Sequence, residues 1–95
     1  MLFASAGQRH AAGDLREATA LYRRLLAAAP QNAAARNNLA NVLADRGCHD
    51  EALAEARAAL AAVSTTDELG AAVRDTVAEL ERAPAQSQGP KARCE

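Results

Sequence analysis

The stretch Gly13–Ala18 reads Gly-Asp-Leu-Arg-Glu-Ala, and the stretch Gly47–Ala52 reads Gly-Cys-His-Asp-Glu-Ala. The two glycines lie 34 residues apart, and each is followed by a Glu-Ala pair at the same separation. A self-similarity at this spacing is the period of a helix-turn-helix repeat. The sequence therefore predicts one supersecondary unit that is used twice.

The residues on either side of the first glycine predict two helices. Residues 2–12 favour helix with a weak apolar face, and Gly13 is expected to end that helix. Asp14 and Glu17 follow at the spacing of a capping box, in which each side chain bonds the other residue's backbone N–H. A second helix is therefore expected from residue 15 onward.

The second unit predicts a matching pair of helices, over residues 33–46 and 50–62. Asn32 is a suitable N-cap for the first of them, because its side-chain oxygen can accept from a backbone N–H in the first turn. Gly47 is expected to separate the two helices as Gly13 does in the first unit.

A fifth helix is expected over residues 67–82, with Thr65 and Glu68 as its capping box. Its apolar residues recur every three or four positions, which is typical of an amphipathic helix. They are Leu69, Val73, Val77 and Leu80. This helix is expected to cover the open end of the stack.

Length and charge exclude several classes of function. Ninety-five residues make one small domain, and the net charge is −1 with acidic and basic side chains interspersed. This pattern argues against a nucleic-acid partner or a membrane surface. No apolar run approaches the roughly 20 residues of a membrane span, and the N-terminus lacks the pattern of a secretory signal. We therefore expect a cytoplasmic protein with a domain over residues 1–82 and a disordered tail over 83–95, which has no periodic apolar face.

With these residues in view, the chain resembles the tetratricopeptide repeat (TPR) family, with two repeats and a C-terminal capping helix. The motifs that carry the resemblance in the first unit are Gly13-Asp14, Glu17-Ala18, Tyr22 and Pro30. Those in the second unit are Leu39-Ala40, Leu43, Gly47, Glu51-Ala52 and Ala59. The resemblance implies an all-α fold in which five antiparallel helices stack as a short right-handed α-solenoid.

The chain departs from the family pattern at several positions. Ser5 and Arg9 stand where the family places large apolar residues, which predicts a frayed or displaced first helix. Ala56 replaces the aromatic residue of the second unit, and Ser64 replaces its closing proline. Two repeats are also fewer than the roughly three that bury a continuous core, so the domain is expected either to dimerise or to have marginal stability alone.

The resemblance implies a binding groove lined by the first helix of each unit and by the cap. The site residues carried over by position are Phe3, His10, Asn37, Asn41, Asp45, Glu68 and Asp75. Asn37 and Asn41 lie one helical turn apart, where their amides can hydrogen-bond an extended peptide backbone. A polar, solvated helix face is the alternative interpretation. The acidic residues of the cap favour a basic or neutral ligand over the C-terminal carboxylate that one TPR subgroup binds.

No constellation of residues predicts catalysis, a metal or a cofactor. Cys48 and His49 are adjacent at a helix start, where a thiol can become nucleophilic, but Asp50 and Glu51 disfavour the thiolate. Two cysteines are too few for a disulfide framework, so we expect Cys48 and Cys94 to be free thiols. The histidines and Cys48 lack a paired metal-ligand spacing.

Three interpretations of function follow. The first is a non-catalytic module that binds a peptide or protein segment in the groove. The second is a self-association module that forms a homodimer through the first or the last helix. The third is a regulatory subunit of a separately encoded enzyme.

Overall fold

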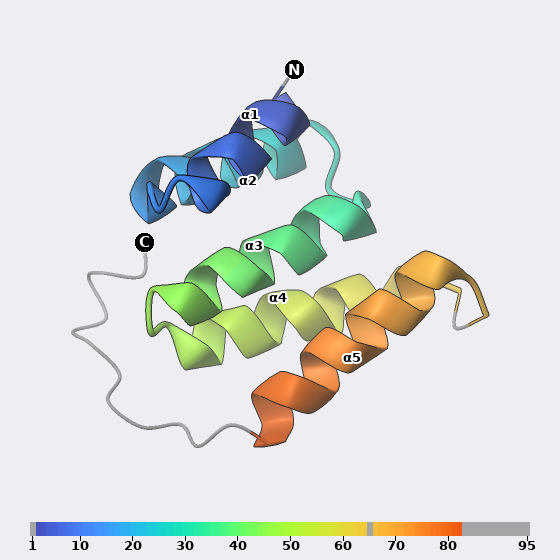
Figure 1. Ribbon diagram of the computed structural model, residues 1–95. Coiled ribbons are helices and arrows are strands. Elements are labelled where there is room, and N and C mark those ends of the chain that lie inside the picture. The colour runs from blue at the N-terminus through green and yellow to red at the C-terminus, as the bar shows by residue number, and fades with distance from the viewer. Residues whose placement is uncertain (1, 65, 83–95) are drawn as a thin grey trace.

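The computed structural model describes residues 2–64 and 66–82, and these residues form five helices (Figure 1). The helices are α1 (Leu2–Ala11), α2 (Leu15–Ala28), α3 (Ala33–Asp45), α4 (His49–Ala61) and α5 (Glu68–Arg82). No strand occurs within these two ranges. The all-α prediction is confirmed, while the tail predicted over 83–95 lies outside the described residues.

The helices are arranged as two hairpins and a terminal helix. α1 packs on α2 and α3 packs on α4, while contacts between α2 and α3 join the hairpins. α5 packs on α4 and also reaches α3 (Figure 1). Helix α3 therefore lies at the centre of the stack, in contact with every other helix. This arrangement is the short α-solenoid that the repeat predicts.

The two hairpins turn in the same way. Gly13 has φ 82° and Gly47 has φ 81°, both in the left-handed region that favours glycine. In each turn the residue after the glycine donates its N–H to a carbonyl in the last turn of the preceding helix, as in a Schellman motif. The bonds are Asp14 N to Arg9 O at 2.8 Å and Cys48 N to Leu43 O at 2.9 Å. The sequence period therefore reflects a repeated backbone geometry.

The first two predicted caps differ in outcome. Asn32 caps α3 as expected, with its Oδ1 accepting from the Ala35 N–H at 3.1 Å. Asp14 makes no side-chain cap bond to α2, so the predicted capping box with Glu17 is wrong. The backbone of Asp14 has φ −86° and ψ 73°, outside the extended region that N-caps adopt.

The residue that caps the fifth helix in the described part of the chain is Asp67. Its Oδ1 accepts from the Gly70 N–H at 2.7 Å. Thr65, the predicted cap, lies outside the described residues. The carboxylate stabilises the start of α5 by satisfying an N–H that has no partner inside the helix.

All five helices contribute side chains to the core, and α2 is buried over a broader face than an amphipathic helix packed on one side. Tyr22 is 2% exposed, and the central helix contributes Leu39, Val42 and Leu43 at 0–1%. Thr19 and Leu21 of α2 are buried as well. Because α2 lies between α1 and α3, it buries two sides instead of one.

The first helix is formed and packed, so the expectation that it is frayed or displaced is wrong. Ala6 is fully buried, and the Phe3 ring meets Tyr22 edge-on, with ring centroids 6.0 Å apart. This aromatic pair gives α1 an apolar contact with α2 that Ser5 and Arg9 cannot supply.

Candidate functional site

The residues predicted to line a groove lie on three helices, α1, α3 and α5. We call the surface made by Phe3, His10, Asn37, Asn41, Asp45, Glu68 and Asp75 the first-helix face. α3 contacts both α1 and α5, so it joins the other two helices that carry this face. The structure thus brings the elements together, while the individual side chains differ in accessibility.

His10 and Asp45 join two of these helices directly. The His10 Nε2 lies 2.7 Å from the Asp45 Oδ2, across the boundary between α1 and α3. The Asp45 side chain is 58% exposed, against 26% for His10. The pair therefore links the hairpins while leaving the carboxylate largely open to solvent.

Asn37 is the most unusual residue of the first-helix face. It is buried at 8% exposure, and its Oδ1 has no hydrogen-bond partner in the described part of the chain. A buried carbonyl oxygen without a donor is costly, because it has lost water without replacing it. Asn41, one turn further along α3, is half-buried.

The neighbouring Asn38 has an internal role. Its side chain hydrogen-bonds the Tyr22 side chain in α2. Burial raises the pKa of Tyr22, and the hydrogen bond with Asn38 opposes that rise. The Asn38 side chain thereby ties α3 to α2.

The remaining members of the face are accessible. Glu68 and Asp75 are exposed on α5, and Phe3 is 38% exposed at the other end of the face. The face therefore offers an aromatic edge at α1, amides on α3 and carboxylates at Asp45 and on α5.

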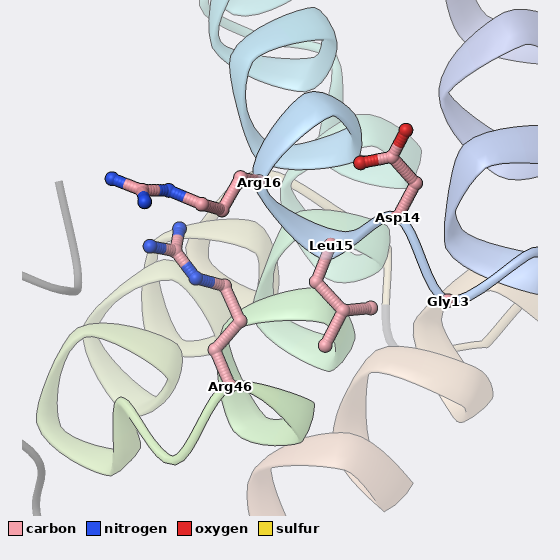
Figure 2. Close-up of a pocket in the computed structure, with 5 residues that line it drawn as sticks. All are labelled: Gly13, Asp14, Leu15, Arg16 and Arg46. Carbon is pink, nitrogen blue, oxygen red and sulfur yellow. The ribbon is translucent and has the colours of Figure 1, made fainter.

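A pocket that the sequence did not predict opens at the turns of the two hairpins (Figure 2). Its volume is about 480 Å³. The lining residues are Gly13, Asp14, Leu15, Arg16 and Arg46. Arg16 lies in the first turn of α2 and Arg46 directly follows α3, so their pairing depends on packing between helices and leaves no local sequence signal.

Arg46 is held against α2 by a short chain of hydrogen bonds. Its Nη1 donates to the Thr19 Oγ1 at 3.0 Å, and that hydroxyl donates to the Leu15 carbonyl at 2.8 Å. Burial lowers the pKa of Arg46, and the positive charges of Arg16 and Arg23 lower it further. The pocket therefore gathers like charges at one place.

Cys48 is not the free thiol that the sequence predicted. Cys48 is buried at 1% exposure and is disulfide-bonded, so the prediction of a free thiol is wrong for this residue. A sulfur in a disulfide is no thiolate nucleophile. Cys94 lies outside the described residues.

Within residues 2–64 and 66–82, no group of three or more His, Cys, Asp or Glu side chains could hold a metal ion. None of the helices described there is long and apolar enough to cross a bilayer.

Comparison with known proteins identifies the family. A family model described as tetratricopeptide repeat matches residues 9–80. Searches of curated proteins and of solved structures gave no match. Repeats of this kind generally mediate protein–protein interaction and are typically non-catalytic. Since the match spans more than half of the sequence, from the end of α1 into α5, the chain belongs to the tetratricopeptide repeat family.

Proposed function

We propose that the chain is a non-catalytic interaction module that binds an extended peptide or protein segment across the first-helix face. Membership of a family whose repeats mediate protein–protein interaction supports this assignment. Because α3 contacts both α1 and α5, an extended segment that crosses α3 can reach residues of the helix on either side.

The single observation that carries the proposal is the Asn37 side chain. Its buried Oδ1 lacks a donor in the described part of the chain. The Oδ1 is buried in the unbound chain, so binding requires the Asn37 side chain to turn outward, where a backbone N–H of an extended segment can donate to it. Asn41 one turn away offers a second amide. Binding would then recover a hydrogen bond whose absence costs the unbound protein stability.

Charge favours a basic or neutral segment. Asp45, Glu68 and Asp75 are exposed on the face, whereas His10 is hydrogen-bonded to Asp45. Cationic side chains of a partner would gain attraction from these carboxylates, and acidic ones would be repelled. The exposed Phe3 ring adds an apolar contact at the α1 end.

The test uses two unstructured peptides of the same length, one of Lys, Ser and Gly and one with Glu in place of Lys. NMR titration of the full chain is expected to shift amide resonances of α1, α3 and α5 with the lysine peptide and to shift them less with the glutamate peptide. Shifts confined to α2 and α4 would contradict the proposal. Light scattering of the same samples tests the alternative, because a self-association module gains mass as its concentration rises.

Substitutions at the adjacent positions Asn37 and Asn38 test the proposed role of the Asn37 side chain. Asn37→Leu removes an unsatisfied oxygen, so the unbound protein is expected to gain stability, on the order of 1 kcal/mol, and to bind the lysine peptide more weakly. Asn38→Leu is the matched control, because it removes the bond with Tyr22 and should lower stability. Urea unfolding and peptide titration measure the two effects. If Asn37→Leu leaves peptide affinity unchanged, Asn37 is not part of the binding surface.

A further inference from the structure

The pocket at the hairpin turns has the size and composition of a binding site. Its volume of about 480 Å³ falls within the range of about 300–1,000 Å³ that is common for ligand pockets. Figure 2 shows the Arg16 and Arg46 guanidinium groups lying close together on one side of it. Leu15 forms an apolar wall between these groups and Asp14.

The two arginines reach the pocket from different helices. Arg16 lies in the first turn of α2, and Arg46 follows the last residue of α3. The bond from Arg46 to Thr19 fixes its guanidinium against α2. Arg23 lies close enough to Arg46 to act on it electrostatically. An oxyanion in the pocket would be attracted by the guanidinium groups of both Arg16 and Arg46.

The acidic residue of the pocket is turned away from the arginines. In Figure 2 the Asp14 carboxylate lies on the other side of Leu15 from the two guanidinium groups, and its Oδ2 lies 3.9 Å from the Arg9 Nη1. Asp14 also makes no side-chain cap bond to α2. The first N–H groups of α2 therefore have no side-chain cap from Asp14, and they add to the positive potential at this point.

We propose that this pocket is a second docking surface that accepts one oxyanion, a carboxylate or a phosphorylated hydroxyl, from an acidic peptide segment of a partner protein. Guanidinium groups bind such oxyanions through paired, charge-assisted hydrogen bonds. A peptide fits the family better than a nucleic acid, since the net charge is −1 and the arginines form a pocket rather than a stripe. This surface goes beyond the proposed function because it lies outside the first-helix face and selects the opposite charge.

Calorimetric titration of the full chain tests the pocket with three peptides that differ at one central residue, which is Glu, phosphoserine or Gln. The Glu peptide is expected to bind at least about tenfold more tightly than the Gln peptide, as befits a charge-assisted contact. Tight binding of the phosphoserine peptide alone also supports the pocket and identifies phosphate as the oxyanion. Equal affinity for all three peptides would overturn it.

Two arginines of α2 provide a matched pair of variants. Arg16→Gln is expected to weaken binding of the charged peptides by about tenfold, whereas Arg24→Gln, which removes the same charge from an exposed residue outside the pocket, should change it little. Equal losses in the two variants would overturn the proposal. Arg16→Gln should leave binding of the lysine peptide to the first-helix face unchanged, so failure of this pocket and failure of the proposed function are distinguishable.

Discussion

The hairpins α1–α2 and α3–α4 have the same turn and different interiors. Their glycines agree within 1° in φ, and the hydrogen bonds that follow them are equivalent. The second helix of the first hairpin buries Tyr22, whereas the equivalent position of the second hairpin is Ala56, which is fully buried. The backbone repeat is therefore preserved although the largest core side chain is not.

This difference shows that the interior of the same repeat can be packed in two ways. The first hairpin depends on one aromatic ring, which contacts Phe3 and hydrogen-bonds Asn38. In the second hairpin the equivalent helix, α4, buries only small side chains, with Ala52, Ala56 and Ala59 all at 0% exposure between α3 and α5. Methyl-sized contacts allow helices to approach closely, but each buries little apolar area. Truncation should damage the first hairpin, and enlargement should damage the second.

The largest effect is expected from Tyr22→Ala. Removing a buried aromatic side chain costs about 3–5 kcal/mol of unfolding free energy, because apolar burial is lost and a cavity remains. Tyr22→Phe is the control, which keeps the ring and loses only the bond with Asn38. The converse change, Ala56→Leu, should cost about 1–3 kcal/mol by overpacking. Urea unfolding followed by circular dichroism measures all three. A stabilising Ala56→Leu would show that the second hairpin contains unfilled space.

Replacing the glycine of either turn should lower the unfolding free energy by a smaller amount, and by the same amount at both turns. Gly13→Ala and Gly47→Ala should each cost about 1–2 kcal/mol, because alanine disfavours a positive φ. A Cβ at either position would meet no atom within 4 Å, so backbone strain is the whole cost. Thermal unfolding of both variants tests the equivalence. Costs that differ by more than the measurement error would mean that the two turns are not energetically alike.

The smallest changes in stability are expected from substitutions at the N-termini of α3 and α2. Asn32→Ala should cost about 1 kcal/mol, because it removes the cap bond to Ala35. Asp14→Ala should cost less than about 0.5 kcal/mol, since Asp14 makes no such bond and its contact with Arg9 is exposed. Urea midpoints of the two variants give the comparison. An equal loss would indicate that Asp14 caps α2 in solution.

Much of the fold could be predicted from residue spacing. Gly13 and Gly47 located the turns, and Asn32 located the start of α3, because these preferences act within a few residues. The capping box at Asp14 failed because its backbone is held by the turn and its carboxylate lies toward Arg9. Local preference gave way there to the geometry of the hairpin.

The candidate surfaces were less predictable. The positions of the first-helix face followed from the repeat, but the burial of Asn37 and the internal bond of Asn38 did not, although the two residues are chemically identical. Their roles depend on which neighbouring helix each one faces. Sequence spacing assigns a helix face only approximately, since adjacent residues differ by about 100° around the axis.

By itself, the sequence determined the helices, their turns and their order, because helix periodicity and glycine conformation are encoded over short stretches. Tertiary structure alone decided that Arg16 and Arg46 share a pocket and that His10 reaches Asp45. These pairs are distant along the chain and meet only when α1, α2 and α3 pack. Packing thereby brings Arg16 and Arg46 together at the turns, whereas Asp45, Glu68 and Asp75 lie on the first-helix face.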